Sequence, residues 1–417
     1  MTKRHALFLA ATLIVGVLLC VRLSSPPSGP RYRITDLQIG ASNVADQGAD
    51  LNERGEVVGG MAVPLPVESA TPSEGGRRRS YVTHPFLWTR ESGMRDLGLL
   101  EGNSGSARDI DERGRILVLE HHQDLSPSAV QPYGGPGGYG TPRPQPKKCA
   151  YVIHSATGAH KILSETRTLS LGHIALGPDN TLRMSGSGLT TVGTQSEDLL
   201  RWSAEKGYES LGNLGGNQVI PESANENGWI AGYALTASRE QHAFIWTPVQ
   251  GMRDIHPTDE RISHAQGLNN RGQVVGFSWS RGGWGGSKPF LWEKETYTPL
   301  PVEHFERCEA QDINDHGEIV GGGSYRPATQ RILTALMQRP WAAWAVPWLE
   351  DWGENWLEER ASALLWKDGE LYDLNHQLVN GDDWVLWSAR HINNKGQIVG
   401  EGTFQGNRRS FLLDPVE

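Results

Sequence analysis

Apolar residues occur along this chain in short runs separated by Gly, Asn and Asp, and the same succession of four runs keeps returning. One copy of the first run is "AQGLNNRG" (265–272), and the second run, "QVVGF", follows at once. The third run is typified by "HAFIW" (242–246) and the fourth by "GMRDI" (251–255). Such runs, rich in Val, Ile, Leu, Phe and Trp, are typical of β-strands and too short for helices. The pattern predicts an all-β protein with a tight hairpin at each Asn-x-x-Gly, where Gly takes a positive φ.

The spacing of the repeat predicts the architecture. The first run occurs seven times, once in the degenerate form "HIALGPDNTL", and the turn positions Asn225, Asn269 and Asn314 are separated by 44 and 45 residues. Four strands in about 45 residues is the signature of a propeller blade. We therefore predict a β-propeller of seven four-stranded blades, with six or eight left open because the third unit matches the pattern poorly.

The two ends of the repeat region complement each other. "RYRITDL" (31–37) has the character of a fourth run without predecessors, whereas "RRSFLLD" (408–414) is a third run without a successor. Pairing these two strands would complete one blade, close the ring and hide both exposed edges.

The N-terminus has the pattern of a membrane-targeting segment. Lys3, Arg4 and His5 precede sixteen uncharged apolar residues (6–21), and Arg22 and the linker "SSPPSGP" follow. An uncleaved anchor is favoured over a cleaved signal because no clear Ala-x-Ala site follows. We predict a cytoplasmic flank at 1–5, an anchor or signal segment at 6–23, a linker at 24–30 and one extracytoplasmic propeller domain at 31–417.

Charge and cysteine content exclude several classes of protein. A net charge of −9 provides no basic field for nucleic acid, so no nucleic-acid partner is expected. The three cysteines fit neither a disulfide scaffold nor a Cys-x-x-Cys metal pair. Cys20 falls in the apolar segment, and we expect Cys149 and Cys308 to be unpaired thiols.

Long insertions follow the second run of several units. They span residues 61–83, 121–148, 278–287 and 324–361. Because antiparallel strands place all links after second runs on one rim, we expect that rim to be the binding surface of the propeller.

Tryptophans are concentrated in these insertions. The last insertion has a stripe at helical spacing, and the third has two more; the candidate binding residues are Trp341, Trp344, Trp348, Trp352, Trp356, Trp279 and Trp284. The stripe either packs the insertion onto the rim or forms a platform for sugars, a groove for a partner, or a belt at the membrane interface.

No familiar catalytic motif is present in the sequence. Just before the Leu/Ile-Asn of the first run, however, four neighbouring units carry Asp50, Asp109, Asp312 and His391. These side chains either bond to the local backbone, the favoured interpretation, or line the channel as a site for a divalent cation such as calcium. No cofactor is expected on the favoured interpretation. His84 and His242 open the third run, but other residue types replace them in other units, which argues against a general base.

The runs "HAFIWTPVQGMRDI", "LNNRGQVVGFSWS" and "SLGNLGGN" resemble the bacterial extracellular HAF-repeat family, whose His-Ala-Phe triplet is matched by His242, Ala243 and Phe244. The resemblance covers about residues 33–417 and implies an exported propeller-like protein without an established catalytic activity. It supplies no functional residues to carry over, and it does not explain the long insertions.

Two functions follow from these patterns. The preferred one is an exported or membrane-anchored binding or scaffold module that engages a glycan or protein through the rim with the insertions. The alternative is a metal-dependent hydrolase or lyase with its site in the central channel.

Overall fold

The computed structural model describes residues 29–37, 50–64, 81–100, 102–121, 149–155, 158–165, 169–176, 182–189, 197–203, 207–257, 260–280, 286–325 and 360–416. In chain order the elements are β1 (Arg31–Asp36), β2 (Asp50–Leu51), β3 (Val57–Pro64), β4 (Tyr81–Thr89), β5 (Gly93–Asp96), β6 (Ser104–Ile110), β7 (Ile116–His121), β8 (Cys149–Ser155), β9 (Gly158–Glu165), β10 (Leu169–Leu176), β11 (Leu182–Leu189), β12 (Glu197–Ser203), β13 (Gly207–Gly212), β14 (Gly215–Ala224), β15 (Ile230–Thr236), β16 (Gln241–Thr247), β17 (Gly251–Asp254), β18 (Glu260–Leu268), β19 (Val274–Ser280), β20 (Lys288–Glu293), β21 (Thr296–Pro299), β22 (Arg307–Ile313), β23 (Ile319–Tyr325), β24 (Arg360–Lys367), β25 (Glu370–Asp373), the 3-10 turn η5 (Leu374–His376), β26 (Trp384–Ile392), β27 (Ile398–Phe404) and β28 (Asn407–Val416).

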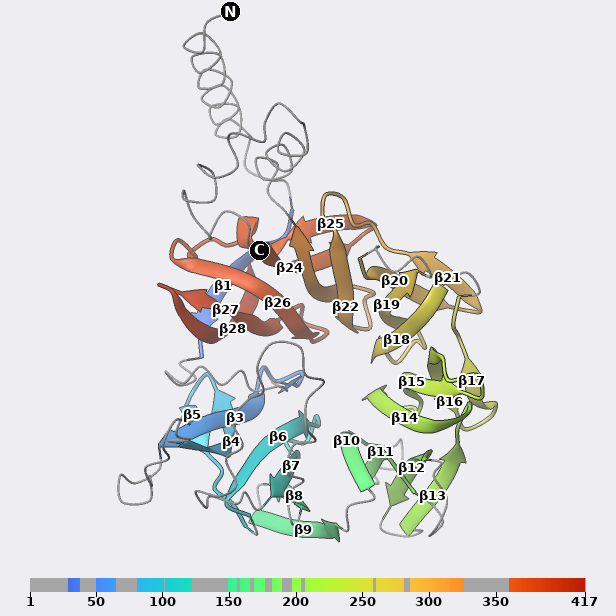
Figure 1. Cartoon of the computed structure of the whole chain (residues 1–417). Coiled ribbons are helices and arrows are strands. Elements are labelled where there is room, and N and C mark those ends of the chain that lie inside the picture. Colours follow the sequence, from blue (N-terminus) through green and yellow to red (C-terminus); the bar gives the residue numbers. More distant parts are fainter. Residues whose placement is uncertain are drawn as a thin grey trace, which may run out of the picture.

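These strands form seven four-stranded antiparallel sheets arranged as blades around a central axis (Figure 1). The first strands of neighbouring sheets, β2, β6, β10, β14, β18, β22 and β26, contact one another all the way round the ring. The predicted β-propeller is therefore confirmed. The four second strands that precede a predicted insertion extend slightly into it, as where β3 continues to Pro64 and β23 to Tyr325.

The N-terminal strand closes the ring, as predicted. β1 pairs with β28 over its whole length, from Arg31 opposite Val416 to Asp36 opposite Phe411. Asn380, in the link before β26, fixes the middle of β1 because its side-chain amide accepts from the Ile34 N–H (2.8 Å) and donates to the Ile34 carbonyl (3.1 Å). The closing blade therefore consists of one strand from the start of the chain and three from its end.

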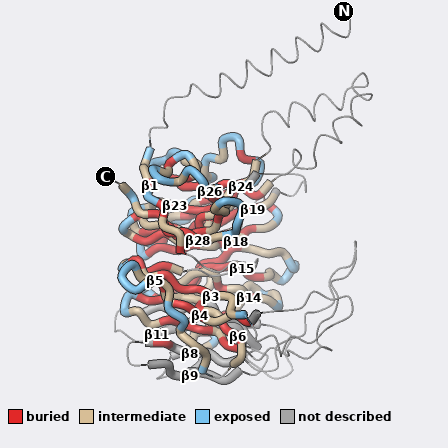
Figure 2. The backbone as a smooth tube through the Cα atoms, turned by 90° about the vertical axis from the view of Figure 1, so that its left-hand side faces the viewer, coloured by how far each residue is buried: buried red, intermediate tan, exposed pale blue. Residues whose placement is uncertain are grey.

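The third strand of each blade supplies much of the core. In the "HAFIW" strand, Ala243 and Phe244 are completely buried between neighbouring sheets, and Phe86, Phe290 and Phe411 occupy the same position in other blades. Buried residues follow the strands, and exposed residues gather at the turns (Figure 2). The second strands pass so close to the first that a Cβ added to Gly276 would overlap the His264 carbonyl oxygen, which explains the repeated Val-Val-Gly and Ile-Val-Gly.

The Asn-x-x-Gly turns confirm the predicted hairpins, and their glycines have positive φ values, as at Gly272 (79°) and Gly317 (86°). The asparagine side chain organises the turn. In the sixth blade, Asn314 Oδ1 accepts hydrogen bonds from the His316 N–H (3.1 Å) and the Glu318 N–H (3.0 Å). One proton of the same amide goes to Glu318 Oε2 (2.7 Å). The turn is thereby held at one length.

From the fourth blade round the closing blade to the first, the remaining amide proton of the turn asparagine bonds the next blade, and we call this row of bonds the asparagine belt. Asn269 Nδ2 donates to the Asn314 carbonyl (2.9 Å), Asn314 to the Asn393 carbonyl (3.0 Å), and Asn393 to the Asn52 carbonyl (3.0 Å). The belt also includes Asn225, which donates to the Asn269 carbonyl (2.9 Å). The asparagines are buried, so these bonds are made in a largely dry environment.

A second row of inter-blade bonds runs beside the belt. The residue after each belt asparagine donates its N–H to the side chain of its counterpart in the next blade. Asn270 donates to Asp315 (2.7 Å), Asp315 to Asn394 (2.7 Å), and Asn394 to Glu53 (2.8 Å). The belt changes at Asp111, which lacks an amide donor and instead accepts from Arg115 Nε (2.6 Å).

Among the described residues, no helix is long and apolar enough to cross a membrane. The predicted anchor at 6–23 lies outside them.

Removing the closing strand tests the ring. A chain beginning at Ser28 keeps β1 and is expected to unfold in urea at the same midpoint as the full chain. A chain beginning at Gln38 loses β1 and exposes the edge of β28, so we expect loss of the cooperative transition or aggregation. Circular dichroism and size-exclusion chromatography report both outcomes, and equal stability of the two chains would contradict the closure.

The Asn314→Ala substitution tests the belt. It leaves the His316 and Glu318 N–H groups and the Asn393 carbonyl without their partner, so we expect a loss of about 2–4 kcal/mol in the free energy of unfolding. The exposed Asn407, which bonds only the nearby Gln405 carbonyl, provides a control as Asn407→Ala. Equal losses for the two variants in urea denaturation would show that the belt has no special role.

Candidate functional site

The topology separates two rims. Turns between first and second strands and between third and fourth strands lie on one, which we call the tight-turn rim. The ends of the second strands lie on the other, which we call the insert rim. The strand ends at Pro64, His121, Ser280 and Tyr325, from which the four predicted insertions leave, all belong to the insert rim. The residues that join these ends, 65–80, 122–148, 281–285 and 326–359, lie outside the described residues.

Aromatic rings gather on the insert rim where the fourth and fifth blades meet. Tyr233 of β15 stacks on His264 of β18, with ring centroids 3.7 Å apart. Trp279, near the end of β19, meets His264 edge-on at 5.5 Å and Phe277 at 4.8 Å. His264 Nε2 also lies 3.1 Å from Gln241 Oε1 of β16. We call Tyr233, His264, Phe277 and Trp279 the aromatic cluster.

Burial sets the charge of this region. It lowers the pKa of His264 to about 4, so the imidazole is neutral at pH 7. Burial also raises the pKa of Glu222 to about 7. Burial and then the Glu222 charge raise the pKa of Tyr233, so this carboxyl lies within electrostatic range of the cluster. The cluster therefore presents neutral aromatic rings beside a carboxyl that titrates near neutrality.

A second group of rings lies in the sixth blade, next to the strand end that leads to the last insertion. His304 stacks on Phe305 at 4.4 Å, and both meet Tyr325, the last residue of β23, nearly at right angles. In the seventh blade, Trp384 packs against Phe404 at 5.3 Å. Aromatic residues thus recur at the insert-rim ends of the first and second strands.

Of the predicted tryptophan set, the structure places Trp279 in the aromatic cluster. The others, Trp284, Trp341, Trp344, Trp348, Trp352 and Trp356, lie outside the described residues, so their binding role stays a prediction. Sequence reasoning missed Tyr233 and His264, whose partners come from different blades.

The four predicted channel residues lie in succession on the first strands. His391 Nδ1 of β26 is 3.5 Å from Asp50 Oδ1 of β2 and 3.6 Å from Asp312 Oδ2 of β22. Asp50 is in turn hydrogen-bonded to Asp109 of β6. A bond between two carboxyl groups needs a shared proton. The sector therefore spans the closing blade and its neighbours on both sides.

Shifts in the strand pairing set the direction of two of these side chains. The pairing of β22 with β23 shifts between Ala310 and Asp312, and that of β26 with β27 shifts between Ala389 and His391. Such bulges redirect the side chain that follows them. The redirected Asp312 accepts from the Ile392 N–H of the next blade at 3.0 Å.

Asp50 makes the corresponding bond to the Ile110 N–H, at 2.9 Å. The carboxylates of Asp50 and Asp312 therefore link neighbouring first strands by bonding the backbone of the next blade, rather than only the local backbone expected from the sequence.

Burial and the neighbouring charged groups shift the pKa values of His391 and Asp50 in opposite directions. Burial works against the charged form of His391, but the hydrogen bond to Asp312 and the charge of Asp50 outweigh it and raise the pKa of the imidazole. Burial likewise works against ionised Asp50, but the His391 charge and the bonds from Asp109 and Ile110 lower its pKa. The state with protonated His391 between two carboxylates is therefore stabilised.

This arrangement does not fit the alternative of a calcium site. The imidazolium stands between the carboxylates, and their oxygens already accept backbone N–H groups. Within the part of the chain that the structure describes, no group of three or more His, Cys, Asp or Glu side chains is arranged to hold a metal ion.

The histidines that open the third strands pair with the fourth strands. His242 Nδ1 lies 2.7 Å from Asp254 Oδ2, and His84 Nδ1 lies 2.9 Å from Asp96 Oδ2. The His-Ala-Phe strand and the "GMRD" strand are thus tied together by side chains as well as by the backbone. Cys308 is a free, buried thiol whose pKa burial raises to about 12, and the side chain of Cys149 lies outside the description.

Comparisons with known proteins support the fold alone. The chain is similar to the β-propeller domain of the Trilobed protease from Pyrococcus furiosus, at 9% identity and a TM-score of 0.50, with 93% of this chain and 95% of that chain covered. It is also similar to Pyrococcus horikoshii acylaminoacyl peptidase, at 9% identity and a TM-score of 0.51, covering 89% of this chain and 52% of that one. A puromycin hydrolase gives 11% identity and a TM-score of 0.50, covering 94% and 58%.

The class of protein is thus a β-propeller similar to those of peptidases. The chain spans about half the length of the acylaminoacyl peptidase, at 52%. The Trilobed protease propeller is described as having an open velcro topology, whereas here β1 is hydrogen-bonded to β28. No protein-family model and no curated protein matches the chain, so the resemblance to the HAF-repeat family stays a prediction.

Replacing His391 tests the electrostatics of the channel sector. Because the pKa of folded His391 is raised above 6.5, its stabilising effect is full below that pH and is lost as the pH rises through the raised pKa. We expect His391→Gln to lower the free energy of unfolding at pH 6 by about 1 kcal/mol, allowing for solvent screening, and to have less effect at pH 9. Urea denaturation across this range measures the difference, with exposed His376→Gln as the control. A pH-independent difference would refute the assignment.

Proposed function

We propose that this protein is an exported or membrane-anchored β-propeller that acts as a binding or scaffold module, and that its insert rim engages a glycan or protein partner. The resemblance of "HAFIW" and "GMRDI" to the HAF-repeat family supports the extracytoplasmic assignment, and the apolar residues 6–21 support the membrane attachment.

The observation that carries the proposal is the aromatic cluster. Tyr233 and Trp279 are half-buried rather than sealed in the core; Trp279 lies one residue before the insert-rim end of β19, and Tyr233 lies three residues before that of β15. Half-exposed rings held by stacking present a rigid apolar face at little conformational cost on binding. His264 is neutral at pH 7 because of burial, so the cluster suits an uncharged partner surface such as the apolar face of a pyranose.

The sequence adds a second argument for this rim. Residues 326–359 contain five tryptophans and connect directly to Tyr325, which belongs to the sixth-blade ring group. The rim therefore combines described aromatic side chains with the most tryptophan-rich segment of the chain. Packing of that segment onto the rim and ligand binding would use the same apolar surface, so the two interpretations compete.

The channel supports the alternative of a metal-dependent hydrolase or lyase less well. Asp50, Asp312 and His391 are close together, but the carboxylates hold neighbouring strands and the imidazole separates them. The acylaminoacyl peptidase and the puromycin hydrolase are chains of which this one covers little more than half, so their names carry no activity over to this protein.

A glycan array and a pull-down, both with the full chain in neutral detergent, test the proposal and separate its two partner classes. We expect Trp279→Ala to weaken capture about tenfold or more, as for a central aromatic in an interface. The matched control is Val249→Ala, because Val249 is 93% exposed and lies on the tight-turn rim. Equal capture by the two variants would argue against the insert rim.

A second variant tests the last insertion. Tyr325 and Arg360 are paired across β23 and β24, so residues 326–359 can be replaced by a two-residue Asn-Gly turn. This turn has the length of the natural Gln405-Gly406 turn in the last blade. We expect this variant to lose capture while keeping its urea midpoint. Retained capture would remove the insertion from the binding site, and loss of the fold would show that it is part of the core.

A further inference from the structure

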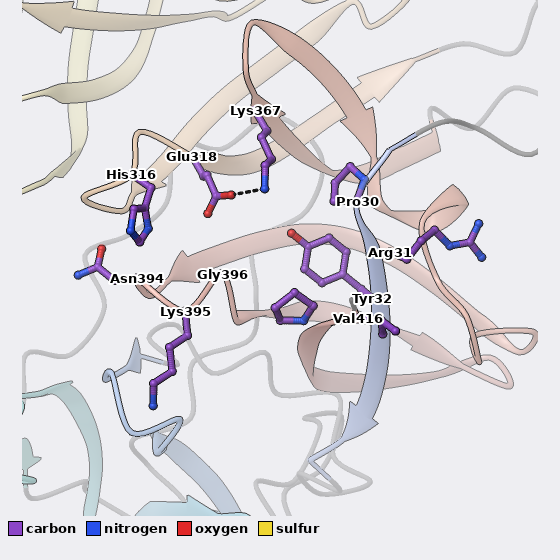
Figure 3. Close-up of a pocket in the computed structure, with 11 residues that line it drawn as sticks. Pro30, Arg31, Tyr32, His316, Glu318, Lys367, Asn394, Lys395, Gly396 and Val416 are labelled. Carbon is purple, nitrogen blue, oxygen red and sulfur yellow. Dashed lines mark ion pairs between the residues drawn. The ribbon is translucent and has the colours of Figure 1, made fainter.

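A polar pocket lies on the tight-turn rim, between the sixth blade and the closing blade (Figure 3). It has a volume of about 330 Å³. Three parts of the chain build it: the start of β1 with the end of β28, the first turns of the sixth and seventh blades, and the third turn of the sixth blade. The side chains that the argument uses are Tyr32, His316, Glu318, Lys367, Asn394 and Lys395.

The walls of this pocket offer more donors than acceptors. Lys367 Nζ lies 2.6 Å from Glu318 Oε1, while Asn314 Nδ2 donates to Glu318 Oε2 at 2.7 Å. Both oxygens of the carboxylate are therefore engaged. A lysine ammonium has three N–H donors, so Lys367 keeps two beyond this pair. Lys395 is exposed at the edge of the pocket, and His316 lies on the facing turn.

Electrostatics keep these groups in their donor forms. The hydrogen bond to Glu318 raises the pKa of Lys367, although burial acts in the opposite direction. Burial and then the Glu318 charge raise the pKa of Tyr32, so its phenol keeps its proton. The pocket thus presents the Lys367 ammonium and the Tyr32 phenol beside one carboxylate that is already paired, and the exposed Lys395, whose side chain runs away from Lys367 and Tyr32, adds a second ammonium at its edge (Figure 3). An anionic oxygen group is the ligand that complements this set.

The place of the pocket suggests where such a group comes from. The start of β1 lines the pocket, since Pro30, Arg31 and Tyr32 are part of its wall. The apolar residues 6–21 precede this strand by the nine residues 22–30. Even fully extended, nine residues reach only about 30 Å. If residues 6–21 lie in a membrane, the tight-turn rim is held close to its surface, while β1 runs from this rim to the insert rim, where the second strands end.

We propose that this pocket binds the phosphate of an anionic phospholipid head group in the membrane that holds residues 6–21. The inference rests on the membrane attachment in the proposed function. Lys367 and Lys395 supply the positive charge, and Tyr32 supplies a neutral donor. Head-group binding fixes the tight-turn rim toward the bilayer and turns the insert rim away from it. The strand ends Tyr325 and Arg360, which residues 326–359 join, then lie on the side of the propeller that faces away from the bilayer.

Native mass spectrometry of the full chain in neutral detergent tests the pocket directly, with dioleoyl phosphatidylglycerol and dioleoyl phosphatidylcholine as probes. We expect one phosphatidylglycerol to bind in preference to phosphatidylcholine. Lys395→Gln is expected to weaken this binding about fivefold, and the Lys367→Gln/Lys395→Gln pair more strongly. The matched control is Lys294→Gln, because this lysine is on the same rim and its side chain is 87% exposed.

Each outcome decides the proposal. Equal binding of the two lipids, or an equal effect of Lys294→Gln and Lys395→Gln, would overturn it. If inorganic phosphate fills the pocket and the lipid is not preferred over it, the assignment of the phosphate to a lipid head group is wrong. Since Lys367→Gln disturbs a folded ion pair, the single Lys395→Gln variant keeps the test valid if the double variant unfolds. The variant with 326–359 replaced should still bind the lipid, so failure at the insert rim and failure at this pocket are distinguishable.

Discussion

The structure depends on a hydrogen bond from the side-chain amide of one blade to the backbone carbonyl of the next. Apolar contacts between sheets, such as those of Ala243 and Phe244, supply cohesion but little directional preference. The belt bonds, for example from Asn269 to the Asn314 carbonyl, have a fixed length and direction. Repeated from blade to blade, they hold neighbouring first strands at one height and one angle. The apolar core and the belt therefore have different roles, the first in stability and the second in geometry.

This constraint explains why the two rims differ. On the tight-turn rim, Asn314 Oδ1 must reach two N–H groups of its own turn, and Asp315 N–H must reach Asn394 in the next blade. An added residue would break both sets of bonds. The insert rim has no such requirement, and the segments 65–80, 122–148, 281–285 and 326–359 all join its strand ends. Long links, and with them the proposed binding surface, are therefore confined to the side where the geometry is free.

Much of the fold could be predicted from sequence because strand length, turn residues and repeat spacing are local properties. The closure of the ring could also be predicted, since residues 31–37 and 408–414 lack the partners that a complete blade needs. The belt could not, because Asn-x-x-Gly is fully explained as a turn, and only the repetition of Asn with Glu or Gln four positions later hints at more. The bulges before Asp312 and His391 leave no distinct residue pattern.

The candidate site, like the fold, could be predicted only in part. Asp50, Asp109, Asp312 and His391 were recognised as neighbours from their equivalent positions in successive units, but their bonds to the backbone of the next blade depend on how far apart the first strands lie. Trp279 was found as an unusual residue near a long link. Its association with Tyr233 and His264 joins two blades, and no spacing in the chain encodes it.

Amide hydrogen exchange at the tight-turn rim tests the bonding between blades, through the belt and the row of bonds beside it, most directly. The N–H groups of Asn270, Asp315 and Asn394 lie in short turns between strands and would exchange rapidly if each blade held only itself. Because each donates to the next blade, we predict that they exchange far more slowly than an exposed turn amide such as that of Val249. Exchange of these turn amides at the rate of the exposed turn at Val249 would contradict the account.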